Sequence, residues 1–329
     1  MARRVVYLDH SVLSNLAKAQ LGILKEGVWL ELLQEFTRLV EADKALFPFS
    51  WTHHYEAELD SRLEDPIHRV GASLARGIGF HAYAQIVAEQ ARREYLNFTG
   101  SERAKISWRE AYEHDPRGDV SERWLASMLG ARVTTDTAGR DRRRAIKDYS
   151  ARSLSADRDA RSWPSYEAAK QHYAQEAVRF YFERPQRAAL AGQLTDSVVP
   201  MLQFSGRVAD AAYGLRIPQR TPAEVIAGLN AMFDFFASEQ CRGMPFIDLE
   251  SSILASLEVD DLSRRYSPGD FYDVETWSAY LPYVDMAVAD GHMHEVLNRR
   301  GLAARFDCSV FPNTADGLRR LTAKLKLAD

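Results

Sequence analysis

Two aspartates directly follow short, mainly apolar runs near opposite ends of the chain. Asp9 comes after Val5–Leu8, and Asp290 comes after the run at 284–289. Both runs have the length and composition of strands. Ligands of an open parallel sheet bind outside the carboxyl ends of its strands. We therefore expect Asp9 and Asp290 to share one site, although either aspartate alone is also typical of a turn or a helix cap.

A third acid lies on the helix that is expected after the second strand. Glu56 shares its helical face with Leu59 and Leu63, which should pack on the sheet. An acid at the edge of a buried face is unusual for a merely solvated charge. The other interpretation is that Glu56 only favours the dipole at the start of its helix. We take Glu56 as a member of the site.

Asp270 and Asp273 supply the fourth acid. They stand three residues apart at the start of a predicted helix over 271–280, so both lie on one helical face. One can cap the helix while the other binds metal, and the spacing leaves the choice open. Asp285 is expected to be structural, because it lies about 16 Å from Asp290 along the strand at ~3.3 Å per residue.

Clustered carboxylates indicate a particular chemistry. They are hard oxygen ligands that suit Mg²⁺ or Mn²⁺, which also bind phosphate oxygens. Such a metal lowers the pKa of bound water and stabilises charge on a phosphate. We expect metal ligands among Asp9, Asp270, Asp273 and Asp290, with Glu56 ligating the metal or orienting water. No catalytic Ser, Cys or His triad is then required.

The elements that must position these acids form an α/β pattern at both ends of the chain. Strands are expected over 5–8, 46–49, 284–289 and 306–311, and helices follow each of them. Between the ends, helical patterns dominate at about 69–98, 101–114, 120–130, 140–155, 164–192, 194–213 and 222–240. The sequence predicts an α/β fold with a parallel-sheet core split into 1–65 and 241–329, and an all-helical insertion over 66–240.

The acid-bearing segments resemble the PIN-domain nuclease family. Tyr7-Leu8-Asp9-His10-Ser11 is similar to the family's first strand, acid and helix. The strongest likeness, to a bacterial PIN-like subgroup, lies in Pro268-Gly269-Asp270-Phe271-Tyr272-Asp273, in Tyr280-Leu281-Pro282-Tyr283-Val284-Asp285, in Val288-Ala289-Asp290 and in Met244-Pro245-Phe246-Ile247. The resemblance covers about the first 60 and the last 90 residues, and the middle has no counterpart.

The resemblance implies a metal-dependent endoribonuclease with Asp9, Glu56, Asp273 and Asp290 as catalytic residues. It would leave 5′-phosphate and 3′-hydroxyl ends, and by analogy it would act as a toxin or phage-defence effector. The chain departs from the family at His10-Ser11, where Thr-Asn is common, and at Ala289 and Thr276, where Thr and His are common. Because all four acids remain, these changes bear on substrate positioning. The alternative is a catalytically silent PIN-like module that binds RNA or protein.

Two other motifs suggest different chemistry. Arg76 and His81 have the Arg-four-His spacing of HEPN-type ribonucleases, which cut without metal, and they fall on a predicted helix. Gly77 stands where those enzymes usually have a polar residue. His292 and His294 could offer imidazoles to Zn²⁺, but a helix is expected to begin there, so exposed helix-start histidines are the preferred interpretation.

A basic stretch in the insertion could bind phosphates. Residues 140–161 contain eight basic and four acidic side chains, so the local charge is 8 − 4 = +4 on a chain with a net charge of −4. Arg142, Arg143 and Arg144 are the proposed RNA contacts. A solvated, salt-bridged helix would have a similar composition.

The bulk composition restricts the class of protein further. The chain of 329 residues is 46% hydrophobic and 27% charged, as in soluble globular proteins. We expect no membrane segment, no signal peptide and a cytoplasmic location, since Cys241 and Cys308 are the only cysteines. A regulatory protein partner and a homo-oligomer are both left open.

Overall fold

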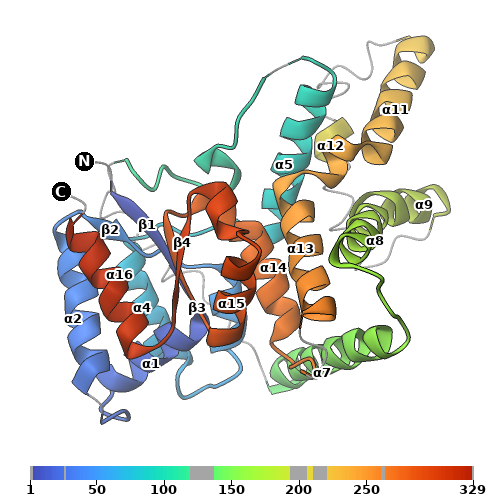
Figure 1. Ribbon diagram of the computed structural model, residues 1–329. Helices are drawn as coiled ribbons and strands as arrows, with labels where there is room; N and C mark the ends of the chain where they lie inside the picture. Colours follow the sequence, from blue (N-terminus) through green and yellow to red (C-terminus); the bar gives the residue numbers. More distant parts are fainter. Residues whose placement is uncertain are drawn as a thin grey trace.

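The computed structural model describes residues 3–25, 27–101, 103–118, 137–192, 206–209, 221–260 and 264–327. Its centre is a four-stranded sheet in the order β2-β1-β3-β4, and all neighbouring strands are parallel (Figure 1). The strands are β1 (Arg4–Leu8), β2 (Ala45–Leu46), β3 (Met286–Ala289) and β4 (Ser309–Pro312). The predicted α/β class and parallel sheet are therefore confirmed.

Helices cover both faces of this sheet, as a parallel sheet requires. Alternating residues of β1 point to opposite sides, so Val6 and Leu8 belong to one buried cluster while Val5 and Tyr7 belong to the other. The first cluster is completed mainly by α1 (His10–Gln20), α2 (Gly27–Glu41), α4 (Glu64–Ala75) and α16 (Ala315–Leu327). The second includes α5 (Tyr83–Phe98), α13 (Pro245–Val259), α14 (Asp270–Tyr280) and α15 (Gly291–Arg299).

Six further described helical segments extend the second face outward, to the right in Figure 1. They are α7 (Thr137–Asp159), α8 (Tyr166–Val178), the π-helical turn η3 (Arg179–Glu183), α9 (Arg184–Leu190), α11 (Pro222–Ala237) and α12 (Glu239–Arg242). They correspond to the helices expected at about 140–155, 164–192 and 222–240. The helix expected at 120–130 and most of that at 194–213 lie outside the described residues.

Two expected helices are wrong. The pattern over 69–98 is broken between α4 and α5, because Arg76 and Gly77 adopt left-handed backbone conformations with φ of 46° and 81°. Phe80 then forms an isolated bridge with Tyr112. The helix expected over 101–114 is reduced to the short turn η1 (Trp108–Glu110). The spacing of apolar residues along the chain does not predict this bridge, because it joins segments that are distant in sequence.

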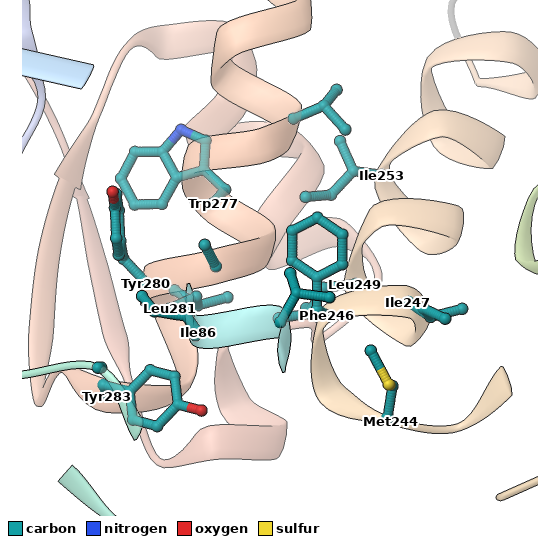
Figure 2. Packing of buried hydrophobic residues seen from close by; sticks show 14 of the residues in the cluster. Ile86, Met244, Phe246, Ile247, Leu249, Ile253, Trp277, Tyr280, Leu281 and Tyr283 are labelled. Atoms are coloured by element: carbon teal, nitrogen blue, oxygen red, sulfur yellow. The ribbon is translucent and has the colours of Figure 1, made fainter. Parts of the chain in front are cut away.

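The helix α13 was not expected. It joins the helices α7 to α12, which we call the helical part, to the sheet. Figure 2 shows Phe246 and Leu249 of α13 packed near Ile86 of α5, with Trp277 on the neighbouring α14. Trp277 in turn meets Tyr7 of β1 edge-on, with ring centroids 5.4 Å apart. The helix that carries Asp270 and Asp273 is therefore held firmly between the sheet and α13.

Packing also continues past the expected boundary at residue 65. Ile67, Val70 and Leu74 of α4 belong to the same buried cluster as β1 and α1. The division into 1–65, 66–240 and 241–329 remains a prediction about sequence, while the packed layers cross it. Within the described residues, no helix is both long enough and apolar enough to span a membrane.

Candidate active site

The sheet places Asp9 and Asp290 side by side. Leu8 of β1 pairs with Val288 of β3, and the N–H of Asp9 donates to the Val288 carbonyl oxygen at 3.0 Å. Adjacent strands lie about 4.8 Å apart, so the two acids leave neighbouring strand ends. The chain passes from β1 outward to β2, whereas β3 and β4 lie on the other side. The acids thus flank the switch point at which such sheets bind ligands.

Both aspartates cap helices, yet each keeps a second carboxylate oxygen. Asp9 Oδ1 accepts the N–H of Ser11 at 2.7 Å at the start of α1, and Asp290 Oδ1 accepts the N–H of Met293 at 2.7 Å at the start of α15. Helix capping was the alternative to a functional role in the sequence. Each of these capping bonds engages one carboxylate oxygen, so capping does not by itself exclude a functional role.

A buried histidine fixes the helix that carries Glu56. Ser50 and His53 form a capping box at the start of α3 (Trp51–Ala57), with the N–H of Ser50 donating to His53 Nδ1 at 3.0 Å. His53 Nε2 therefore carries the proton and donates to the carbonyl oxygen of Leu8 at 2.7 Å. Burial lowers the pKa of His53 to about 3, so the ring is neutral. This bond ties α3 to the end of β1, beside Asp9.

A pair of threonines brings Asp273 to the same place. Thr52 Oγ1 on α3 and Thr276 Oγ1 on α14 are 2.8 Å apart in a side-chain hydrogen bond. Glu56 lies one turn beyond Thr52, and Asp273 lies about one turn before Thr276. Both acids therefore adjoin the contact between the two helices. Thr276 stands where the PIN nucleases that the sequence resembles commonly have a histidine, and here it joins α3 to α14.

The pKa shifts of Asp9 and Asp273 indicate that the four predicted acids lie close enough to repel one another. Burial, followed by repulsion from Asp9, Glu56 and Asp290, raises the pKa of Asp273 well above its usual range. Burial also raises the pKa of Asp9 to about 6, because repulsion from Glu56 and Asp290 adds to it and hydrogen bonds from Ser11 offset only part. Among the described residues, the Asp273 carboxylate has no hydrogen-bond or ion-pair partner. Asp273 thus lies within the electrostatic field of the other three predicted acids, and no cation among the described residues pairs with it.

Asp270, the other candidate ligand, has a different environment. Both of its oxygens accept bonds from the Arg264 guanidinium at 2.7 Å, and the N–H of Ser267 donates to it at 2.7 Å. Burial acts to raise the pKa of Asp270, but these bonds more than offset it and the pKa is lowered. Of the pair that the sequence left open, Asp270 is neutralised by a protein cation and Asp273 is not.

Asp285 has the structural environment that its position predicts. It accepts the N–H of Val5 at 2.7 Å and the guanidinium of Arg117 at 3.0 Å. It therefore fastens β3 to the start of β1, at the opposite end of the strands from Asp9 and Asp290.

Lys147 and His10 belong to the site and were not singled out in the sequence. Lys147 Nζ, on α7, lies 2.7 Å from Glu56 Oε1 and 4.8 Å from the centre of the Tyr272 ring. His10 Nδ1 lies 3.9 Å from Glu56 Oε2, and burial lowers the pKa of His10. One signal was present in the sequence, because Arg140, Arg144 and Lys147 share one helical face.

The predicted RNA contacts are only partly described. The side chains of Arg142 and Arg143 lie outside the described residues. Arg144 donates to the carbonyl oxygen of Leu59 at 2.7 Å, and 57% of its side chain is exposed. It therefore helps to dock α7 and still presents its guanidinium to solvent.

One competing motif follows the end of a helix, and the other lies at the start of one. The expectation of a helix at Arg76 and His81 is wrong: Arg76 ends α4 in a left-handed conformation, and the N–H of His81 donates to Ala111. His292 and His294 lie in the first turn of α15, as expected, but both are half-buried and not exposed.

The acids fit a divalent cation by their chemistry and not as a preformed cage. Across the described ranges, no group of three or more His, Cys, Asp or Glu side chains could hold a metal ion as it stands. Mg²⁺ keeps several waters and commonly uses one or two carboxylates together with substrate phosphates, so three protein ligands are not required. When no cation is bound, burial and the neighbouring acids favour the protonated form of Asp273, so a divalent ion would compete with a proton for this carboxyl group.

Comparison with known proteins adds no relative. The chain matches no protein-family model, no curated protein and no solved structure, so the resemblance to PIN nucleases rests on its own residues.

Proposed function

We propose that the protein is a PIN-like, metal-dependent endoribonuclease that hydrolyses RNA phosphodiester bonds at Asp9, Glu56, Asp273 and Asp290. The observation that carries this proposal is the buried Asp273 carboxyl group, which three further acids surround and no described cation neutralises. A cluster of this kind costs stability unless an external cation binds it. Because this destabilising cluster lies at the switch point of a parallel sheet, where ligands bind, it supports a functional site.

Each of the four acids has the role that its position in the fold suggests. Asp9 and Asp290, fixed at neighbouring strand ends, would hold Mg²⁺ or Mn²⁺, and Asp273 would complete the site. When bound, the ion would supply an activated water and stabilise charge on the phosphate. Glu56, held between Lys147 and His10, would accept a hydrogen bond from the attacking water. The helical part would select the RNA or bind a regulator, and a toxin or phage-defence role is consistent with this division.

The deciding experiment follows cleavage of a generic single-stranded RNA. We expect cleavage with Mg²⁺ or Mn²⁺, weak cleavage with Ca²⁺ and none in excess EDTA, because Ca²⁺ prefers longer bonds and more ligands. The products should carry 5′-phosphate and 3′-hydroxyl ends. Asp9→Asn should lower the rate by at least about 100-fold, on the scale of removing one group that stabilises a transition state.

The outcomes separate the alternatives. Cleavage that persists in EDTA would support a metal-independent ribonuclease. A protein that binds RNA but neither binds Mn²⁺ in calorimetry nor cuts would be a silent binding module. Full activity in Asp9→Asn would exclude the four-acid site.

A further inference from the structure

Helix α7 lies along the segment that carries Glu56 and attaches to it through three basic residues. Arg140 pairs with Glu64 at 3.3 Å, Arg144 donates to Leu59 O, and Lys147 pairs with Glu56. Figure 1 shows α7 beside the end of α14, the helix of Asp273. The first two contacts are enough to orient α7. The third brings a cation from the helical part into the acidic site.

Lys147 is largely withdrawn from solvent. Only 13% of its side chain is exposed, and the ammonium sits between the Glu56 carboxylate and the face of Tyr272. Burying an ammonium is costly unless it is paired, and Glu56 supplies the pairing carboxylate. An ammonium has three donor hydrogens, and these contacts leave donor capacity for another oxygen. The charge is thus held ready beside the carboxylates at which a phosphate would bind.

We propose that Lys147 is a catalytic residue that donates a hydrogen bond to a non-bridging oxygen of the scissile phosphate. This inference rests on the proposed nuclease function and deepens it. During hydrolysis the water oxygen forms a bond to phosphorus and the bond from phosphorus to O3′ breaks. One water proton passes to solvent, and the leaving O3′ gains a proton to become the 3′-hydroxyl. Lys147 stays protonated throughout and stabilises the negative charge that accumulates on the phosphate oxygens.

The location of Lys147 makes its charge effective. A fixed cation in a partly water-excluded site needs no reorganisation when charge develops, and such groups contribute about 100-fold or more to rate. Without this cation, the four acids would repel a negatively charged phosphate. Through Lys147, α7 therefore contributes a cation beside the acids of the α/β core.

The test compares Lys147→Met and Lys147→Arg with a matched control, Lys170→Met. Lys170 is also a lysine of the helical part paired with a carboxylate, Asp248, and its side chain is 23% exposed. Three quantities are measured for the full chain: kcat and KM for single-stranded RNA, Mn²⁺ affinity by calorimetry, and melting temperature. Mn²⁺ affinity separates a phosphate contact from a role in building the acidic site.

We expect Lys147→Met to lower kcat by about 100-fold with a smaller change in KM. Its Mn²⁺ affinity should be unchanged or tighter, because a competing cation leaves Glu56. Lys147→Arg should recover at least about tenfold of the lost rate, and Lys170→Met should cut like the wild type, with a melting temperature close to that of Lys147→Met.

Three results would overturn the role of Lys147. The first is wild-type or faster cleavage by Lys147→Met, which would make the lysine a spectator or a block on the site. The second is a parallel loss of rate, Mn²⁺ affinity and melting temperature, which would make it a structural contact. The third is a wild type that neither binds Mn²⁺ nor cuts RNA, and that result also removes the proposed function, whereas the first two leave it standing.

Discussion

The N–H of Asp9 donates to the carbonyl oxygen of Val288 at 3.0 Å, two residues before Asp290. The first and last acids of the site are therefore held by the pairing of β1 with β3 and not by separate loops. A change to either carboxylate should leave the backbone in place. This makes the acids suitable for substitution, because loss of function can be separated from loss of fold.

The apo protein should become more stable when the Asp9 charge is removed. The pKa of Asp9 is about 6 in the folded state, against about 3.9 when unfolded, so folding grows weaker as pH rises from about 4 through 6. At about pH 7.5 in EDTA, Asp9→Asn should raise the free energy of unfolding by about 1–3 kcal/mol, from 1.36 kcal/mol per pKa unit with allowance for residual solvation. The gain should shrink at about pH 5. Urea unfolding at both pH values measures it.

Asp285→Asn is the control for this prediction. Asp285 neutralises Arg117 and accepts the N–H of Val5, so its substitution should lower stability at about pH 7.5. If Asp9→Asn is also less stable than the wild type at that pH, Asp9 does not lie in a field of like charges.

Thr276→Val should weaken metal binding through geometry. The change removes the bond to Thr52 that holds α3 against α14, and with it the placement of Glu56 relative to Asp273. We expect a stability loss of about 1 kcal/mol and a severalfold loss of Mn²⁺ affinity, since a shift in supporting contacts commonly costs about 10-fold or more at metal sites. Calorimetry and urea unfolding measure the two effects.

Thr322→Val provides the matched comparison. Thr322 is similarly buried, and its hydroxyl donates to Leu318 O within α16, on the other face of the sheet. It should lose similar stability and keep its Mn²⁺ affinity. Equal effects of the two substitutions on Mn²⁺ would show that Thr276 acts only through global stability.

The basic stretch over 140–161 should contribute to RNA affinity. In an Asp9→Asn background, alanine at Arg142, Arg143 and Arg144 should weaken binding and lower the salt slope by about 0.7 for each lost phosphate contact on single-stranded RNA. Affinity across a salt series measures this. Alanine at Arg319 and Arg320 of α16, on the opposite face, should leave the slope unchanged. An unchanged slope in the folded triple variant would show that the RNA follows another path.

Trp51 should stack on an RNA base next to the site. Trp51 and Tyr55 are 48% and 40% exposed on the helix that carries Glu56, with ring centroids 6.2 Å apart. Stacking contributes about 1–3 kcal/mol per base, so Trp51→Ala should weaken single-stranded RNA binding at least about fivefold and leave the salt slope intact. Phe233→Ala, on the remote α11, is the control because Phe233 is 53% exposed. Equal affinity of Trp51→Ala and wild type would exclude a base at this helix.

The sequence determined the strands and the acids that follow them. The continuous apolar run Val5–Leu8 and the apolar run before Asp290 specify buried parallel strands, since each residue must face one of two covered sides. The carboxyl ends of such strands fix where Asp9 and Asp290 lie. These features depend on local pattern and on general rules of sheet topology, so they can be read without coordinates.

Only the tertiary structure decided which remaining groups join the acids. The choice between Asp270 and Asp273 depends on Arg264, and the contact of Lys147 with Glu56 joins residues 91 positions apart. The bridge after α4 likewise depends on Phe80 meeting Tyr112, which is distant in sequence. Side-chain pairing across elements follows from packing and desolvation, which sum over many weak contacts between distant segments. Periodicity along the chain indicates which face of a helix or strand a residue occupies, but not which residues of other elements pack against that face.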